Sequence, residues 1–597
     1  MRPAYLIEAE KLRANPEQWA ALQSEGSVVI LAGPGSGKTQ TISVKFAKLL
    51  HEEVKSPRGI AGLTYNNESA RELKRRLSTL GIEESKRTFV GTIHGFCLQH
   101  LLLPFSELAG MPMPNPVEVA NGTKISELVE RAMAERGSYE NPRDVRPRIE
   151  RYRRSHVDRT LPSWKETDQE TAELCETYEN LLVGEGLIDF DEMVLRGFRL
   201  LKENEWIRRI ILAKFPIFII DEYQDLGTPL HEMVLLLMES GVRIIAVGDP
   251  DQSIYDFTGA KPELLTELSE KPRVETIRLR LNYRNGRRIV STSLTVLDEE
   301  RQFESVRADE GTITIVHVPE GFERQARVVC EEIIPALTSG ENPRSAGEIA
   351  ILYNDYHDAA VVTRAVRQAG FKYVGGDKQI RYENTPLTRW VEDCAKWCSG
   401  GWYKAQPRIS WILDFWLAFN RESVGLADLR EIRHKLVQLL WANRDPDMLL
   451  KDWLDKLNEF GIPELAKKIR ARSNEAESYQ HLYEAACDPE RLGGMNIAAF
   501  GGLRGASDHL NLLTLHSAKG LEYDSVIIMG LEQGKLPSFN AVTEYAKREQ
   551  RRRFYVGLTR ARYEVFLLYS GWYENAYGRR FQNGPSEYIE EVRRSLA

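Results

Sequence analysis

Short, nearly continuous apolar runs recur along the chain, and segments with helical spacing of apolar residues lie between many of them. Such runs are typical of strands buried on both faces of a parallel sheet and joined by crossover helices. The pattern therefore predicts an α/β fold with two parallel sheets. The predicted strands of the first sheet are 28–32, 60–65, 88–96, 217–220, 242–247 and 277–284, and those of the second are 312–318, 349–353, 371–377, 511–515, 525–529 and 563–569.

Two long stretches break this rhythm. Residues 98–191 are rich in Glu, Arg and Leu, residues 381–504 are rich in Trp and Leu, and neither stretch has a clear strand. We therefore expect two α/β units, each interrupted by a mainly helical insertion. The first unit comprises residues 1–97 with 192–284, and the second comprises residues 285–380 with 505–597. This architecture favours a motor that holds a nucleotide between its two sheets.

The stretch from Val28 to Leu50 carries the strongest chemical signal. An apolar run is followed by a glycine-rich loop and by a helical pattern that opens at Lys38 and Thr39. Backbone N–H groups of such a loop and the positive end of the helix dipole bind phosphate, and the strand and helix around it argue against a chance glycine loop. We expect Lys38 to reach the outer phosphates of a nucleoside triphosphate and Thr39 to hold Mg²⁺. The loop residues are Ala32, Gly33, Pro34, Gly35, Ser36, Gly37, Lys38 and Thr39.

Further polar residues stand where an ATPase needs them. Asp221 and Glu222 follow a buried apolar run, at the end of a strand where ligands bind in open α/β sheets. We expect Asp221 to hold Mg²⁺ through water and Glu222 to orient and deprotonate the attacking water. Gln252, after the next run, is placed to sense the γ-phosphate. Gln18, behind a helix start at Asn15–Pro16, is either an exposed helix residue or a reader of the adenine edge.

The composition constrains the setting. The chain has 597 residues, a formal net charge of −7 and 42% hydrophobic residues, so it is not a uniformly basic nucleic-acid binder. Its six cysteines lack metal spacing, and we expect Cys394 and Cys398, one helical turn apart, to be two buried thiols rather than metal ligands. We find neither a signal segment nor a membrane-spanning run, and we expect a cytoplasmic protein in a reducing compartment.

An arginine run lies inside the first insertion. Residues 143–159 hold seven arginines against three acids, interleaved with Tyr152 and His156. A charge run is usually a solvated helix face, but an arginine-only run suits phosphate backbones. We expect this run to contact duplex DNA. The candidate residues are Arg151, Arg153 and Arg154.

Taken in order, these segments resemble the motifs of UvrD/Rep/PcrA-type superfamily 1 DNA helicases over nearly the whole chain. The resemblance implies two RecA-like P-loop NTPase domains, the use of ATP and Mg²⁺, and single-stranded and tailed duplex DNA as partners. The matching motifs are N-P-E-Q at 15–18, the P-loop at 32–39, T-x-x-N-x-x-A at 64–70, G-T-x-H at 91–94, D-E-x-Q-D at 221–225, G-D-x-x-Q-S-I-Y at 248–255, N-Y-R at 282–284, T-x-H-S-A-K-G-L-E at 514–522 and Y-V-x-x-T-R-A at 555–561.

The resemblance also implies roles around the nucleotide. Gln18 would read adenine, Tyr283 would stack on it, and Glu522 would bond the ribose. Arg284 and Arg560, one from each α/β unit, would act as arginine fingers on the γ-phosphate. Closure and opening of the two sheets around ATP would then drive stepping.

For the DNA, the resemblance points to aromatic side chains. Tyr65, His94 and Phe257 match family positions along the single-strand path, where stacking accepts any base. Tyr577 matches the tyrosine of the family hairpin that splits the duplex. The expected activity is that of an ATP-dependent 3′→5′ DNA helicase or translocase, as in DNA repair.

Two other readings stay open. The chain could be a DNA-sensing ATPase subunit of a larger complex, for example an anti-phage complex with a nuclease partner, or it could act with a repair factor. This reading is motivated by the second insertion, which lacks a recognisable G-I-G duplex-gripping motif, and by the missing tail of the longer relatives. A non-catalytic scaffold would predict damaged catalytic positions, but all of them are intact: Lys38, Asp221, Glu222, Gln252, Arg284 and Arg560.

Overall fold

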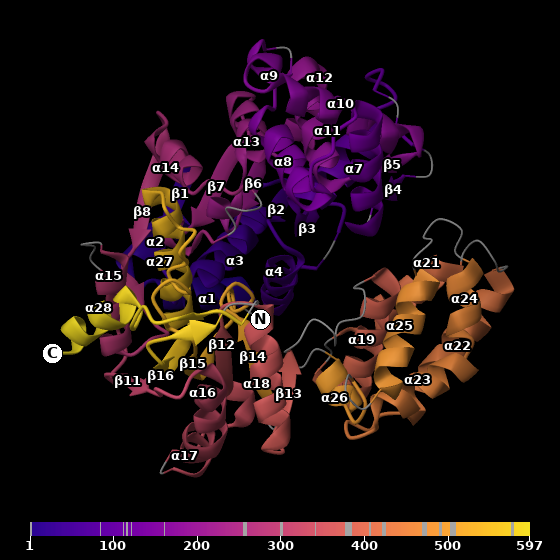
Figure 1. Ribbon diagram of the computed structural model, residues 1–597. Helices are drawn as coiled ribbons and strands as arrows, with labels where there is room; N and C mark the ends of the chain where they lie inside the picture. The colour runs from indigo at the N-terminus through magenta and orange to yellow at the C-terminus, as the bar shows by residue number, and fades with distance from the viewer. Residues whose placement is uncertain are drawn as a thin grey trace. The chain divides into compact units, whose positions relative to one another are not determined.

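The computed structural model forms two compact units, each built on one six-stranded sheet (Figure 1). Unit 1 comprises residues 1–312, 541–559 and 591–597, and unit 2 comprises residues 313–540 and 560–590. The prediction of an α/β fold with two parallel sheets of RecA type is confirmed. The structure describes residues 3–83, 85–111, 113–114, 117–120, 122–159, 161–254, 259–298, 303–340, 342–375, 385–404, 407–420, 426–468, 475–488, 492–501, 509–574 and 578–597.

The sheet of unit 1 has the strand order β3-β2-β6-β7-β1-β8, and all of its neighbouring strands run parallel. Its carboxyl ends therefore share one edge, and the P-loop follows β1 there, as Asp221 follows β6. Because crossover connections make all the strands run in the same direction, residues that follow different strands meet at this edge although they are far apart in the sequence. The strands are β1 (Ser27–Ala32), β2 (Ile60–Thr64), β3 (Thr88–Thr92), β6 (Ile217–Ile220), β7 (Arg243–Gly248) and β8 (Val274–Leu279).

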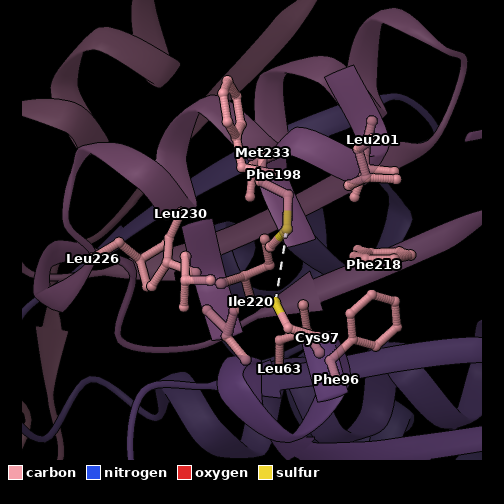
Figure 2. Close-up of a cluster of buried hydrophobic side chains, with 14 of the residues drawn as sticks. Leu63, Phe96, Cys97, Phe198, Leu201, Phe218, Ile220, Leu226, Leu230 and Met233 are labelled. Atoms are coloured by element: carbon pink, nitrogen blue, oxygen red, sulfur yellow. Dashed lines mark hydrogen bonds between the residues drawn. The ribbon is translucent and has the colours of Figure 1, made fainter. Parts of the chain in front are cut away.

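Both faces of this sheet are buried. Ile217 and Ile219 pack into one hydrophobic cluster, whereas Phe218 and Ile220 pack into the other, because successive side chains of a strand point to opposite faces. Figure 2 shows part of the second of these clusters, in which the Sγ atom of Cys97 lies 3.9 Å from the sulfur of Met233. Full burial of each such aliphatic side chain contributes about 1.5–3 kcal/mol. The sheet is thereby held as a rigid base for the loops at its edge.

Helices cover the sheet of unit 1 and also form its insertion. Within the insertion, which the sequence predicts to be mainly helical with no clear strand, two strands of two residues each, β4 (Glu118–Val119) and β5 (Leu187–Ile188), also pair in parallel. The signal of two-residue strands is too short to read from a sequence. The helices are α1 (Ala4–Leu12), α2 (Pro16–Gln23), α3 (Lys38–Lys48), α4 (Asn67–Thr79), α5 (Ile93–Phe96), α6 (Leu103–Phe105), α7 (Gly122–Arg136), α8 (Pro142–Ser155), α9 (Ser163–Glu166), α10 (Gln169–Gly184), α11 (Phe190–Glu203), α12 (Glu205–Lys214), α13 (Thr228–Glu239), α14 (Glu263–Glu270), α15 (Arg287–Leu297) and α27 (Glu544–Leu558).

The sheet of unit 2 has the strand order β11-β16-β15-β12-β14-β13. The pairings from β16 to β13 are all parallel. A short antiparallel hairpin of β17 (Tyr573–Glu574) and β18 (Arg580–Phe581) follows β16. The strands of the sheet are β11 (Thr312–His317), β12 (Ile349–Tyr353), β13 (Lys372–Gly375), β14 (His509–Thr514), β15 (Tyr523–Ile528) and β16 (Ala561–Tyr569), and the helices near them in sequence are α16 (Phe322–Val328), α17 (Ile334–Ser339), α18 (Tyr356–Gln368) and α28 (Glu587–Leu596).

The described part of residues 385–501 is helical and has its own core. Trp390, Trp453 and Leu482 are among its buried side chains. Cys394 and Cys398 lie in the same core, and burial raises the pKa of Cys398 to about 12, so their interpretation as buried thiols is confirmed. The helices are α19 (Pro386–Lys396), α20 (Trp402–Lys404), α21 (Ile409–Asn420), α22 (Leu426–Ala442), α23 (Leu450–Glu459), α24 (Ile462–Lys468), α25 (Glu475–Cys487) and α26 (Ile497–Phe500).

Candidate ATP site and nucleic-acid interface

The glycine loop between β1 and α3 leaves no room for side chains at two of its positions. Gly35 and Gly37 have φ angles of +71° and +81°, in the left-handed region that favours glycine. A Cβ atom at Gly35 would lie 2.5 Å from the Cβ of Arg284, and one at Gly37 would lie 2.5 Å from the Nε2 of Gln18. The loop therefore needs glycine at both positions, and its tight curl leads into the first turn of α3 at Lys38.

The N-Y-R segment after β8 holds the loop from the other side. The side-chain amide of Asn282 donates to the carbonyl of Pro34 at 2.9 Å, and the backbone N–H of Tyr283 donates to the carbonyl of Gly35 at 2.8 Å. Asn282 also accepts from the backbone N–H of Arg284 at 2.8 Å. Tyr283 leaves 43% of its surface exposed. An exposed ring beside the loop is available for stacking on a nucleobase.

Helix α2 brings Gln18 to the same loop. Asn15 caps this helix by accepting from the backbone N–H groups of Glu17 and Gln18, and its side-chain amide donates to the hydroxyl of Tyr283 at 3.0 Å. The Nε2 of Gln18 donates to the backbone carbonyl of Ser36 at 3.0 Å. The residues expected to recognise adenine, Gln18 and Tyr283, are thus held on the P-loop by a continuous set of hydrogen bonds.

A lysine and two carboxylates face one another beyond the loop. The Nζ of Lys38 lies 3.4 Å from the Oε1 of Glu222. Burial, and then the charge of Glu222, raise the pKa of Asp221 to about 7. Burial works to lower the pKa of Lys38, but the charges of Glu222, Asp221 and Asp249 outweigh it and raise that pKa. Glu222 itself has a φ of +53°, which is uncommon for a residue with a side chain.

The charged side chains beside the P-loop show whether this site suits the expected Mg²⁺ and triphosphate. Lys38 faces the carboxylates of Asp221, Glu222 and Asp249, and a divalent cation here would offset the negative charge of these carboxylates. In the described part of the chain, no group of three or more His, Cys, Asp or Glu side chains is close enough to hold a metal. Mg²⁺ commonly takes only one or two protein ligands and fills its shell with water and phosphate oxygens. Asp221 therefore fits a magnesium ion that arrives with a nucleotide, and the role of Thr39 in holding that ion stays a prediction.

A buried glutamine connects these carboxylates to Gln252. Gln224 is fully buried; its amide donates to the Glu222 carboxylate, and its carbonyl oxygen accepts from the backbone N–H of Asp249. Asp249 in turn accepts from the Nε2 of Gln252 at 2.7 Å. Sequence reasoning assigned no role to Gln224 or Asp249. The D-E-x-Q-D and G-D-x-x-Q patterns contain both residues and could have pointed to them.

Two expected nucleotide contacts belong to unit 2. Arg560 is almost fully buried, and its Nη1 donates to the backbone carbonyl of Leu521 at 3.2 Å. The next residue, Glu522, accepts from the Nη2 of Arg562 at 2.8 Å. Arg560 and Glu522 are therefore neighbours within unit 2. Their reach to a nucleotide on the P-loop stays a prediction.

Aromatic rings gather near the ends of β2 and β3. The rings of Tyr65 and His94 lie 6.3 Å apart edge to face, and His94 lies 5.5 Å from Phe190, which is 56% exposed. Burial, with the charge of Arg154, lowers the pKa of His94 to about 4, so this ring is neutral at physiological pH. The group suits stacking with bases. Two further DNA candidates, Phe257 and Tyr577, lie outside the described residues.

The arginine run does not face the solvent as a whole. Arg153 is fully buried on α8, and its guanidinium pairs with Glu179 and Asp189 at 2.6 Å and with Glu192 at 3.1 Å. The expectation that Arg153 binds DNA was therefore wrong, because its donors are consumed inside the insertion. Arg154 is half-buried and pairs with Asp191 at 2.7 Å. Arg151 is exposed.

Other arginines of the run are also paired within the insertion. Arg146 contacts Glu150 at 2.9 Å, and Arg148 makes a two-pronged contact with Glu140. Arg159 pairs with Glu179. The positive charge that the run offers to phosphate is thus much smaller than its composition suggests.

Comparison with known proteins decides the family. The UvrD/REP helicase N-terminal domain family matches residues 14–273, and the UvrD-like helicase C-terminal domain family matches residues 501–571. The chain belongs to the UvrD/Rep/PcrA-type family of DNA helicases. It is an enzyme of this class, and Lys38, Asp221 and Glu222 lie within the first matched region. In the described residues, no helix is both long and apolar enough to cross a bilayer.

Relatives in this helicase family align over almost all of the chain. The ATP-dependent DNA helicase Rep of Escherichia coli (strain K12) is 27% identical, over 97% of this chain and 94% of its own length. The ATP-dependent DNA helicase PcrA of Bacillus subtilis (strain 168) is 24% identical, over 97% of this chain and 85% of its own length. DNA helicase II of Escherichia coli (strain K12) is 26% identical, over 99% of this chain and 88% of its own length.

Proposed function

We propose that this chain is an ATP-dependent motor that moves along single-stranded DNA in the 3′→5′ direction and separates duplex DNA. The observation that carries the proposal is the assembly of Lys38, Asp221, Glu222 and Gln252 around one P-loop, in a chain of the UvrD/Rep/PcrA family. We also propose that residues 1–97 with 192–284 and residues 285–380 with 505–597 are the RecA-like domains. Residues 98–191 and 381–504 would then be the insertions.

The first step assigned to the chain's own residues is an exchange of partners by Lys38. The Nζ of Lys38 lies 3.4 Å from the Oε1 of Glu222. When the outer phosphates of ATP enter the loop, their charge draws the lysine away, because a triphosphate carries more negative charge than one carboxylate. Glu222 would then accept a proton from the attacking water. ATP binding thus prepares the base for hydrolysis.

The second step couples hydrolysis to the neighbouring segment. Gln252 lies in the short 3-10 turn Pro250–Gln252 that follows β7, where it would sense the γ-phosphate, and Asp249 connects it to Gln224 and Glu222. Mg²⁺, held by Thr39 and Asp221, would neutralise charge that develops on the phosphates. Arg284 and Arg560 would complete the site as arginine fingers. Loss of the γ-phosphate would therefore alter the contacts of Gln252. Gln252 precedes residue 257, a proposed DNA contact, in the sequence.

Aromatic side chains would line the path of the single DNA strand. Tyr65, His94 and Phe257 would stack with successive bases, which is tolerant of sequence because every base has an aromatic face. Tyr577, which lies between β17 and β18 in the sequence, would split the two strands of the duplex. The expected substrates are single strands and duplexes with a single-stranded tail.

Polarity can be tested by protein displacement. Oligonucleotides carrying streptavidin on a biotin at either the 5′ or the 3′ end are incubated with the protein and ATP. A 3′→5′ motor displaces streptavidin from the 5′ end and leaves it on the 3′ end. Displacement from the 3′ end alone would overturn the assigned direction, and ATP hydrolysis without displacement from either end would overturn translocation.

One observation favours a second function, a DNA-sensing ATPase subunit that opens little duplex on its own. The arginines of residues 143–159 are largely paired with acids of their own insertion, which leaves fewer cations to grip a duplex. Such a subunit would act with a nuclease or a repair factor. Stable co-purification of a partner that restores strand separation would support this function.

A further inference from the structure

Lys45 is a fully buried lysine outside the catalytic site. It lies on α3, and its Nζ donates to the backbone carbonyls of Leu22 at 3.3 Å and Ser24 at 2.8 Å and to the hydroxyl of Ser24 at 2.9 Å. These acceptors all lie at the carboxyl end of α2. The last carbonyls of a helix have no partner within it, and a cation there is favoured by the helix dipole. Lys45 therefore fastens the end of α2 to α3.

A second cation supports the same turn. Arg243, at the start of β7, donates to the backbone carbonyl of Gly26 at 2.8 Å and to that of Ser24, and it pairs with Glu53 at 2.8 Å. Lys48, one turn after Lys45, contacts α2 through a side chain, the Oε1 of Gln23 at 3.4 Å, and it also pairs with Glu52 at 3.9 Å. The backbone at the end of α2 is thus held mainly by Lys45 and Arg243.

The other end of α2 is tied to the adenine side of the ATP site. The carboxylate of Glu17 accepts from the backbone N–H of Arg280 at 2.6 Å, and the Asn15 amide donates to Tyr283. Gln18 lies in the first turn of this helix, with its amide on the carbonyl of Ser36. With both ends of an eight-residue helix fixed, the position of the Gln18 amide beside the loop is fixed as well.

Lys45 acts at a distance from the nucleotide. It follows Lys38 by seven residues on the same helix, which is a rise of roughly 10 Å. We propose that Lys45 is a positioning residue for base recognition, which holds α2 against α3 so that Gln18 meets the adenine edge. This inference rests on the proposed role of Gln18. A site built to hydrogen-bond one base rejects another strongly only when its polar groups are held in place.

The surroundings of Lys45 supply a second readout. Burial lowers the pKa of Lys45 to about 7, with help from the charges of Arg243 and Lys48, against the opposing effect of Glu53 and Glu275. The protonated amine makes charge-assisted hydrogen bonds, which are stronger than neutral ones. As the pH rises through about 7, the hold on α2 weakens, so the KM for ATP should rise more steeply in the wild type than in a variant without this amine.

The test measures kcat and KM for ATP and for GTP, with single-stranded DNA present. In Lys45→Met, we expect the preference for ATP to fall about tenfold through the KM for ATP, with kcat within about twofold. Lys48→Met on the same helix is the matched control and should behave as the wild type. Lys45→Arg keeps donors at this position and should restore part of the preference. If Lys45→Met does not fold, Lys45→Gln, which retains one donor group, takes its place.

Gln18→Ala separates failure of the inference from failure of the proposed function. If Gln18→Ala loses the preference for ATP but Lys45→Met, or Lys45→Gln in its place, keeps it, Lys45 is only a structural residue and the inference is overturned. If Gln18→Ala keeps the preference, or if the wild type has none, Gln18 does not read the base, and both the base-reading role and this inference are wrong. If Gln18→Ala and Lys45→Met both lose the preference for ATP over GTP, the result supports the base-reading role of Gln18 and the positioning role of Lys45.

Discussion

The side-chain carbonyl oxygen of Gln224 lies 3.0 Å from the backbone nitrogen of Asp249 and accepts its hydrogen bond. The approach is close enough that a Cβ atom at Gly248 would lie 2.3 Å from the same oxygen. Since the Gln224 amide also donates to Glu222, one buried side chain connects the proposed catalytic base to the segment that carries Gln252. This relationship is a physical link between the proposed catalytic base and the proposed γ-phosphate sensor.

Substitution Gln224→Glu should slow catalysis without weakening ATP binding. The new carboxylate can still accept from the N–H of Asp249, but it replaces a donor with a negative charge beside Glu222 and so misplaces the base. We expect kcat to fall about 10- to 100-fold, as when a preorganised polar contact in an active site is lost, with the KM for ATP within about threefold. Steady-state hydrolysis at saturating single-stranded DNA measures both. Gln169→Glu, at an exposed position, is the control, and an unchanged kcat in Gln224→Glu would remove Gln224 from the mechanism.

Much of the ATP site could be predicted from the sequence because its signals are local. The apolar runs that form β1 and β6 and the glycine loop are contiguous, and a family resemblance gave Gln18 and Tyr283 their roles. The part played by Gln224 could not be predicted from spacing, because it depends on Asp249, which lies 25 residues further along the chain and is brought near by parallel strand pairing.

Burial is the property that composition does not reveal, and Arg153 illustrates it. Its run reads as a basic face, yet its partners Glu179, Asp189 and Glu192 lie 26, 36 and 39 residues later in the chain. Only the packing of α8 against the following helices turns this arginine inward. The strands β4 and β5 were missed for a related reason, because a pair of two-residue strands forms only in a tertiary context.

Arg153→Met should destabilise the fold and leave the DNA affinity of the folded protein unchanged. The change removes the cation from a buried set of carboxylates, and breaking a buried ion pair in this way typically costs about 3–5 kcal/mol. Urea unfolding of the wild type and the variant measures the change in the free energy of unfolding. Arg151→Ala, at an exposed position of the same helix, should change stability by less than about 0.5 kcal/mol. A stable Arg153→Met protein with weaker DNA binding would contradict the structural assignment.

His94 should contribute to a loss of stability in mild acid. Its pKa in the folded protein is about 4, below the ordinary value of 6.5, so between these values the unfolded chain binds a proton that the folded chain does not. Stability therefore falls as the pH drops from about 7 to 5. In His94→Asn this part of the pH dependence disappears, which urea midpoints at the two pH values can measure. Equal losses in both proteins would show that His94 titrates normally in the folded state.

Tyr577→Ala should reduce duplex opening and spare hydrolysis. If Tyr577 stacks on the last base pair ahead of the motor, its loss removes the wedge but leaves the P-loop and the strand path intact. We expect strand separation on a tailed duplex to fall severalfold, about the effect of losing one base-stacking contact, while single-strand-stimulated ATPase stays within about twofold. Tyr139→Ala, a fully exposed tyrosine of the insertion, is a matched control. If both activities fall equally, Tyr577 is a structural residue.

The central claim is that the residues gathered on the P-loop drive a DNA motor, and one measurement tests it most directly. ATP hydrolysis and strand separation are followed together on a 3′-tailed duplex with the purified protein, beside Lys38→Ala, which removes the cation that faces Glu222. We expect DNA-stimulated hydrolysis and strand separation in the wild type and neither activity in the variant. Hydrolysis that persists in Lys38→Ala would contradict the ATP site, and a wild type that hydrolyses ATP while the duplex stays closed would contradict autonomous unwinding in favour of the DNA-sensing subunit.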